Sequence, residues 1–149
     1  MATRAIICIE HENKTIDGIY CHFGQDAGVT LNSFYRDENR VRELMELGSL
    51  SVLRKYLKPI LEWDTPQPNP FKDNPPLVKH SYETPQENVT VAYHRDRGEE
   101  LHMSDFADRE DLIGSVEGID HVYLFTEGEW HTMRGGKFIP LANLATFEY

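Results

Sequence analysis

The chain has 149 residues, 40% of them hydrophobic and 11% aromatic, a composition typical of one globular domain. Its formal net charge of −10 argues against ordinary nucleic-acid binding, because lysine and arginine are needed to neutralise phosphates. The longest apolar run, Ala5 to Ile9, is far shorter than the ~20 residues that cross a membrane, so we expect an intracellular protein that binds no membrane.

Two β-branched and aromatic runs open the chain, over residues 4–10 and 14–23, with a short polar turn between them. This pattern predicts an N-terminal hairpin. On its second strand, alternation places Tyr20 and His22 on one face. The other face carries Ile19, Cys21 and Phe23, and we assign it to the core.

Three short helices are expected next, because apolar side chains recur at helical spacing. Their predicted N-terminal caps are Thr30, Asp37, and either Ser49 or Ser51. Gly48 is placed to end the second helix. The side chains expected to be buried are Leu31, Phe34 and Tyr35 in the first helix, Val41, Leu44 and Met45 in the second, and Leu50, Leu53 and Leu57 in the third.

Seven of the eight prolines fall between Pro59 and Pro85. They predict a Pro-rich extended segment over residues 59–88, either pinned to the body by its aromatic side chains or inserted as a mobile loop. We expect this segment to interrupt a single domain that spans residues 1–149.

The second half is predicted to resume with a strand over residues 88–93 and a charged turn over 93–100. A helix follows, capped by Ser104 or Asp105 and ending at Glu117. Residues 121–133 predict a hairpin that turns at Glu127 and Gly128. The whole pattern predicts an α+β fold, with a mostly antiparallel sheet and helices on one face.

Catalytic motifs are poorly represented. Four histidines lie on or beside expected strands without the spacing of a metal site: His22, His94, His121 and His131. Cys21 and His22 are neighbours on one strand, so their side chains point to opposite faces and cannot form a catalytic pair. No phosphate-binding loop is present, and two cysteines support neither a disulfide framework nor a structural zinc site. We therefore expect a protein without catalytic residues, metal or cofactor.

The sequence YHRDRGEE, residues 93–100, packs two arginines among carboxylates. Guanidinium groups one residue apart bind a small anionic ligand, or they brace the turn by pairing with its own acids, and we favour the brace. The alternative, a ligand site, combines this turn with the polar face of the second strand: Tyr20, His22, His94, Arg95, Asp96, Arg97 and Glu99.

Charge is unevenly distributed along the chain. Residues 96–129 contain eleven acidic and two basic side chains. Such a run is either a solvated surface or a surface that binds a basic partner or imitates a nucleic-acid backbone. The predicted partner-binding acidic face consists of Asp105, Asp108, Glu110, Asp111, Glu117 and Asp120.

Four segments resemble a group of small bacteriophage and prophage accessory proteins. They are IYCHF at 19–23, LGSLSVL at 47–53, YHRDRGE at 93–99 and YLFTEGEW at 123–130. The resemblance covers most of the chain in order, apart from the Pro-rich segment, and the loop after Phe23 departs from the group. It implies a viral protein that acts on host machinery in the cytoplasm of an infected bacterium, and it carries over no catalytic residue.

Three functions follow in order of preference. The first is a phage-encoded acidic inhibitor that binds a host protein with a basic surface, as a counter-defence or host-takeover factor. The second is a protein that binds or sequesters a small anionic ligand, such as a nucleotide signal. The third, a hydrolase, is the least favoured. The pattern leaves the host target and the oligomeric state open.

Overall fold

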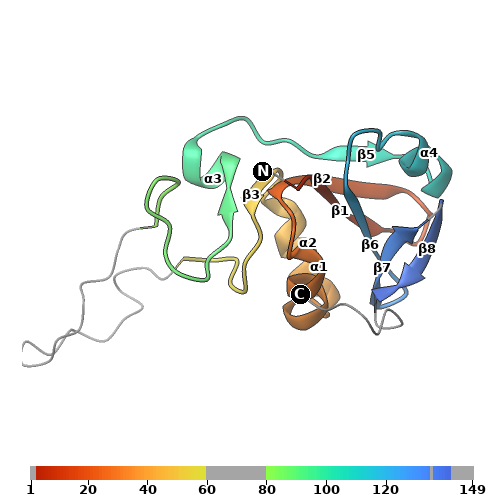
Figure 1. The fold of residues 1–149 in the computed structure, drawn as a ribbon, viewed down its shortest axis with the longest axis horizontal. Helices are drawn as coiled ribbons and strands as arrows, with labels where there is room; N and C mark the ends of the chain where they lie inside the picture. Colours follow the sequence, from red (N-terminus) through yellow and green to blue (C-terminus); the bar gives the residue numbers. More distant parts are fainter. Residues whose placement is uncertain (1–2, 60–79, 135, 142–149) are drawn as a thin grey trace, which may run out of the picture.

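A computed structural model describes residues 3–59, 80–134 and 136–141 (Figure 1). The strands are β1 (Ala5–Glu10), β2 (Ile16–Phe23), β3 (Leu50–Val52), β4 (Val91–Ala92), β5 (Ser104–Phe106), β6 (His121–Thr126), β7 (Glu129–Arg134) and β8 (Lys137–Pro140). The helices are α1 (Ala27–Phe34), α2 (Glu38–Glu46), α3 (Tyr93–Arg97) and α4 (Arg109–Gly114).

The strands form one mixed sheet in the order β4-β3-β2-β1-β6-β7-β8, with β5 paired to the first residues of β2. Two pairs are parallel, β1 with β6 and β2 with β3, and the other pairs are antiparallel. The predicted α+β class with a mostly antiparallel sheet is confirmed.

Both predicted hairpins are present. β1 and β2 pair antiparallel and reverse between His11 and Thr15, whose backbone groups join at 2.8 Å. β6 and β7 reverse at Glu127 and Gly128, which both have positive φ values of 54° and 77°. Positive φ at both central residues matches the twist of the flanking strands, which explains the glycine.

Each face of the sheet has its own apolar core. On one face, Ile7 and Ile19 pack with Leu31 of α1 and Leu44 of α2. On the other face, Cys8 packs with Phe106 of β5 and with Leu112 of α4. The two longest helices therefore share one face, as predicted, and the short α4 adds a second covered face.

The helix termini show which capping predictions hold. Asp37 accepts a hydrogen bond from the Asn39 N–H at 3.1 Å and caps α2, as predicted. Gly48 has a φ of 70° and follows α2, also as predicted. Thr30 is not a cap, because α1 already begins after Asp26. The Thr30 hydroxyl instead donates a hydrogen bond to the Asp26 carbonyl oxygen at 3.1 Å.

Three other local predictions are wrong. Residues 50–52 form β3 instead of a third helix, because they pair with β2 and β4. Residues 93–97 form α3 instead of a turn. The predicted helix at 104–117 is divided into β5 and α4, and its cap is Asp108. Within the predicted Pro-rich segment 59–88, residues 60–79 lie outside the described residues.

Candidate functional site

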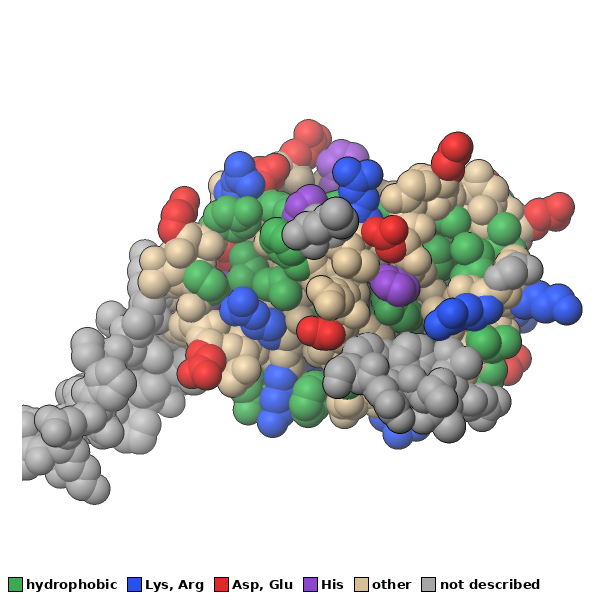
Figure 2. Space-filling model, viewed as in Figure 1, with side chains coloured by type: hydrophobic (Ala, Val, Ile, Leu, Met, Phe, Trp, Pro, Cys, Tyr) green, Lys and Arg blue, Asp and Glu red, His purple; other side chains and the backbone are tan. Residues whose placement is uncertain are grey.

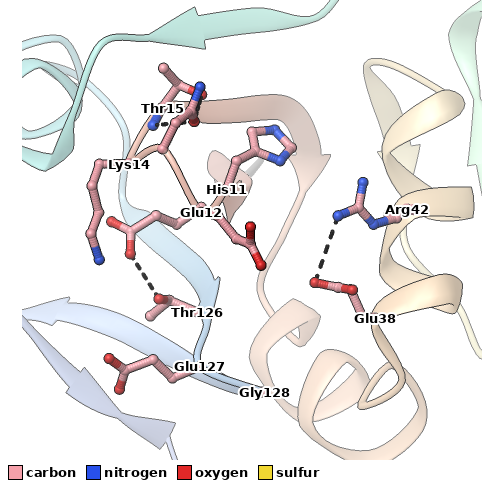
Figure 3. A pocket seen from close by; sticks show the side chains of 11 residues that line it. His11, Glu12, Lys14, Thr15, Glu38, Arg42, Thr126, Glu127 and Gly128 are labelled. Atoms are coloured by element: carbon pink, nitrogen blue, oxygen red, sulfur yellow. Dashed lines mark hydrogen bonds and ion pairs between the residues drawn. The ribbon is translucent and has the colours of Figure 1, made fainter.

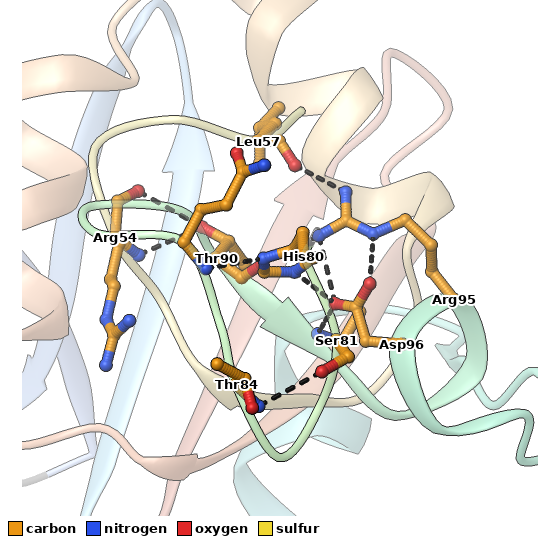
Figure 4. Close-up of polar contacts among 10 residues, drawn as sticks. Arg54, Leu57, His80, Ser81, Thr84, Thr90, Arg95 and Asp96 are labelled. Atoms are coloured by element: carbon orange, nitrogen blue, oxygen red, sulfur yellow. Dashed lines mark hydrogen bonds and ion pairs between the residues drawn. The ribbon is translucent and has the colours of Figure 1, made fainter. Parts of the chain in front are cut away.

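Arg95 and Asp96 of α3 form a buried polar cluster with His80 (Figure 4). The Arg95 guanidinium donates from Nε to Asp96 Oδ1 at 2.9 Å and from its NH2 group to Asp96 Oδ2 at 3.0 Å. It also donates to the carbonyl oxygens of Leu57 and Thr90. All of its contacts are thus inside the protein, and they join α3 to the segments before and after the Pro-rich region.

His80 completes this cluster. Its Nδ1 accepts the Gln86 backbone N–H at 3.0 Å, so the ring proton resides on Nε2, which lies 3.1 Å from Asp96 Oδ2. The side chains of His80 and Asp96 are only 2% and 4% exposed. We call His80, Arg95 and Asp96 the brace, and its contacts agree with the structural interpretation of the charged sequence.

The Asp96 carboxylate stays ionised in this buried place. Burial alone raises the pKa of Asp96, but the Arg95 guanidinium, the Ala92 N–H and His80 together outweigh burial and hold that pKa below its ordinary value. The Ala92 N–H donates to Asp96 Oδ2 at 2.8 Å. Asp96 therefore acts as the acceptor that fixes the start of α3, and its side chain, 4% exposed, is shielded from solvent.

The other residues of the predicted ligand site are more accessible. Arg97 lies 4.7 Å from the centre of the Tyr82 ring and pairs with Glu99 at 3.3 Å. His94 contacts the Glu99 carbonyl oxygen at 2.7 Å, where Gly98 ends the helix at a φ of 76°. These contacts close the helix end.

Tyr20 and His22 lie on β2 and contact each other, with 2.8 Å between the tyrosine hydroxyl and His22 Nδ1. Burial raises the pKa of Tyr93 of α3, and the nearby hydroxyls of Tyr82 and Tyr20 add smaller increases to that pKa. The structure thus brings β2 and α3 near each other, while Arg95 is turned inward. A ligand site that uses Tyr20, His22 and Arg97 remains a prediction.

The predicted acidic face lies on β5, α4 and the loop that follows. All six of its acidic residues are exposed: Asp105, Asp108, Glu110, Asp111, Glu117 and Asp120. Figure 2 shows acidic side chains at the edge of the molecule where β5 and α4 lie, with basic side chains below them. Residues 104–120 contain one base, Arg109. We call these six acidic residues the acidic face.

Four members of the acidic face also have structural contacts. Asp108 accepts the Asp111 N–H at 2.8 Å, and Asp111 accepts the Ala107 N–H at 2.9 Å. Asp120 accepts the Arg4 N–H at 2.9 Å. The carboxyls of Glu110 and Glu117 have no polar partner among the described residues, so they are fully available to a binding partner.

The fourth structural contact pairs two carboxyls. Asp105 of β5 lies directly opposite Asp17 of β2, so the two carboxyls are close to each other. Asp17 also contacts His11 Nε2 at 2.8 Å. Contact with Asp17 raises the pKa of Asp105. Burial raises the pKa of Asp17, but the interactions with His11 and Asp105 outweigh burial and lower that pKa.

A half-buried ion pair attaches α4 to the sheet. The side chain of Glu10 on β1 is 4% exposed and accepts two hydrogen bonds from Arg109, at 2.7 and 3.0 Å. Thr126 donates to the same carboxylate at 2.8 Å. The Arg109 bond lowers the pKa of Glu10 most, and burial opposes it. Arg109 is therefore occupied, and it does not neutralise the acidic face.

A hollow lies between the β1–β2 turn, the start of α2 and the β6–β7 turn (Figure 3). Its volume is about 740 Å³, and its charged lining includes Glu12, Lys14, Glu127 and the Glu38–Arg42 pair, separated by 3.7 Å. Among the described residues, no hydrophobic side chain lines it. It lacks the apolar walls typical of small-molecule sites.

The two cysteines are not placed to act as nucleophiles. The thiols of Cys8 and Cys21 are buried, and burial raises the pKa of both, to about 12 for Cys21. Among the described residues, no three histidine, cysteine or acidic side chains are grouped to hold a metal ion. His131 is buried on β7 and His121 stacks on Tyr123.

Comparisons with protein-family models, curated proteins and solved structures find no match to this chain. The resemblance to phage accessory proteins therefore remains a prediction. In the described part of the chain, every helix is too short or too polar to span a bilayer.

Sequence reasoning missed two important groups. His80 lies in the Pro-rich region, where no periodic pattern connects it to Asp96 sixteen residues later. Glu10 ends the first strand, and its partner Arg109 is 99 residues away. A buried position for an acid was the available signal, because such acids require a cationic partner.

Proposed function

We propose that this protein is a phage-encoded accessory protein that binds and inhibits a host protein in the cytoplasm of an infected bacterium. The acidic face is its binding surface. The observation that carries the proposal is that six exposed carboxyl side chains lie on one continuous segment, whose single base is already paired with Glu10. A surface of this kind attracts a basic partner.

The anchoring of the acidic face supports this function. The side chain of Asp108 caps α4, and the Glu10–Arg109 pair attaches the helix to β1. Carboxylates that are held before binding lose less conformational freedom when the partner arrives. The natural target is a host protein whose basic surface normally binds nucleic acid, because a row of carboxylates imitates the phosphate charges.

The decisive variant is Glu110→Gln with Glu117→Gln. Neither carboxyl has a polar partner among the described residues, so the change removes charge without removing a structural contact. The matched control is Glu43→Gln with Glu46→Gln, two exposed acids on α2, which packs on the opposite face of the sheet. Both variants lose the same amount of negative charge.

The test begins with capture of partners from a bacterial lysate at 50 mM NaCl, followed by native mass spectrometry. The partner is then purified, and its own activity and its Kd are measured with each variant. Two exposed ion pairs are worth roughly 1–2 kcal/mol, so the Glu110 and Glu117 variant should bind about 5- to 30-fold more weakly. Binding by the wild type should weaken as salt rises, since exposed charges are screened.

The control variant should bind like the wild type, and the bound partner should lose activity. A partner that binds the Glu110 and Glu117 variant as tightly as the wild type would contradict the role of the acidic face. A partner that keeps full activity in the complex would contradict inhibition.

A further inference from the structure

A second hollow lies where two parallel strands end. Phe23 and Val52 are the last residues of β2 and β3 and are paired across the sheet, and α1 begins at Ala27. The hollow between them has a volume of about 490 Å³. We call it the β2–β3 end pocket. The first residues of α1 line this pocket together with the ends of the two strands.

Two aromatic rings in this pocket are open to solvent. Phe23 is 50% exposed and Phe34 is 41% exposed, although both occupy positions where the sequence pattern predicts core residues. Large exposed apolar groups that line a concave surface are a sign of binding, because a ligand that covers them removes apolar surface from water. A phenyl ring offers a flat face on which another flat ring stacks.

The pocket also has uncompensated positive charge. Arg54 and Lys55 line it, and no described acid lies within ion-pair distance of either. The Arg54 side chain points away from the brace (Figure 4). Lys55 Nζ lies 5.2 Å from the centre of the Phe34 ring. One acid, Asp26, is part of the lining. A net positive pocket is unexpected in a chain of net charge −10.

The shape of the pocket depends on Gly24. A side chain at this position would begin 2.5 Å from the Ala5 Cβ atom, and the Gly24 N–H donates to the Thr3 carbonyl oxygen at 2.7 Å. The loop from β2 to α1 is therefore pressed against the start of β1. This contact holds Phe23 and the first turn of α1 in fixed relative positions.

We propose that the β2–β3 end pocket binds a nucleotide. Its base stacks on Phe23 or Phe34, its phosphates contact Arg54 and Lys55, and Asp26 accepts an N–H from the base. The volume is within the ~300–1,000 Å³ of small-molecule sites. The pocket shares no residue with the acidic face or with the predicted site at Tyr20, His22 and Arg97, so the proposal is independent of both.

The test is isothermal titration calorimetry of the full chain with ADP, GDP, CDP and UDP. At least one of them should bind. Arg54→Ala with Lys55→Ala should weaken that binding about tenfold or more, because both phosphate contacts are lost. Phe34→Leu keeps an apolar side chain but removes the ring, and it should weaken binding about fivefold or more. Lys14→Ala is the control for a cation elsewhere on the surface, and it should leave the affinity unchanged.

Two further probes identify the source of the ligand and the role of its base. Pyrophosphate should bind more weakly than the best nucleoside diphosphate. A 5′-phosphorylated hexathymidylate should bind more weakly than the free nucleotide. Tighter binding of the oligomer, lost in the Arg54 and Lys55 variant, would overturn the free nucleotide in favour of a strand end. The site itself would be overturned if no nucleotide binds at millimolar concentration, or if affinity is equal in the Arg54 and Lys55 variant. Circular dichroism establishes that each variant is folded.

Discussion

Asp96 shows how a single buried carboxylate organises this molecule. It accepts hydrogen bonds from Arg95 and from the Ala92 backbone, and His80 Nε2 lies 3.1 Å from its Oδ2. The three groups belong to segments before, within and after β4. A buried charge is stable only with such partners, and it becomes a large cost when one of them is removed.

Asp96→Asn should therefore lower the free energy of unfolding by about 3 kcal/mol, because it leaves the Arg95 guanidinium without its counter-charge. Urea denaturation at pH 7 measures this loss. The control is Glu99→Gln, which breaks the pair between Arg97 and Glu99, whose side chains are 50% and 49% exposed. That change should cost under about 1 kcal/mol. Equal losses in the two variants would contradict the brace.

Among the elements, β5 has the most unusual attachment. It has three residues and is joined to β2 beside Gly18, where a Cβ atom would lie 3.1 Å from Phe106. That close packing stabilises the pairing of β5 with β2. Repulsion between the opposed carboxyls of Asp17 and Asp105 destabilises the same pairing at neutral pH. A group whose pKa is raised by folding contributes stability at low pH and loses it as pH rises through the folded value.

Asp105→Asn should therefore raise the urea midpoint at pH 7, because the amide donates to Asp17 without adding a like charge. The gain should disappear at pH 3, where carboxyls of ordinary pKa are mostly protonated. Glu110→Gln is the matched control, since it removes one charge from α4 away from Asp17. A lower midpoint for Asp105→Asn at pH 7 would show that the two carboxyls do not repel each other.

Sequence patterns predicted elements well where the pattern was local. The hairpins follow from alternation and from turn residues such as Gly128, and α2 follows from the Asp37 cap. The residues 50–57 misled the prediction because their leucines have helical spacing, while pairing with β2 makes them extended. Short α3 has too few residues to show a period.

The candidate sites were predictable to different degrees. Exposure of the acidic face follows from its composition, since unpaired carboxylates avoid burial. The inward orientation of Arg95 depends on carbonyl groups of Leu57 and Thr90, which no local pattern reveals. The β2–β3 end pocket was not predicted at all. It arises because two strands end together, and Phe23 was assigned to the core by alternation alone.

At the scale of the whole molecule, two ionised carboxylates make stability depend on pH. Folding lowers the pKa of Asp96 and of Glu10, and each has cationic or hydrogen-bonding partners that keep it charged. A group whose pKa is lowered by folding contributes stability above its ordinary value, and that contribution is lost as pH falls through the folded value. Acid should therefore weaken both the brace and the Glu10–Arg109 pair that attaches α4, because both carboxylates are protonated as pH falls through their folded pKa values.

The urea midpoint of the wild type should fall as pH is lowered from 5 to 2.5. In this range, the difference in free energy of unfolding between wild type and Asp96→Asn should shrink below pH 3.8, the ordinary pKa of aspartate. The measurement is a series of urea titrations at fixed ionic strength. A difference that stays constant down to pH 2.5 would mean that the Asp96 charge does not contribute to stability.

The place of β1 in the sheet also determines when the protein can fold during synthesis. β1 pairs on one edge with β2, which follows it closely, and on the other edge with β6, whose first residue is His121. A nascent chain can close the first hairpin early, but one edge of β1 then has no partner until the chain has grown through Thr126. For most of translation, the most apolar strand of the protein is an open sheet edge, which other chains can join. Production of this protein in a crowded cell therefore depends on protection of that edge until the ribosome has delivered β6.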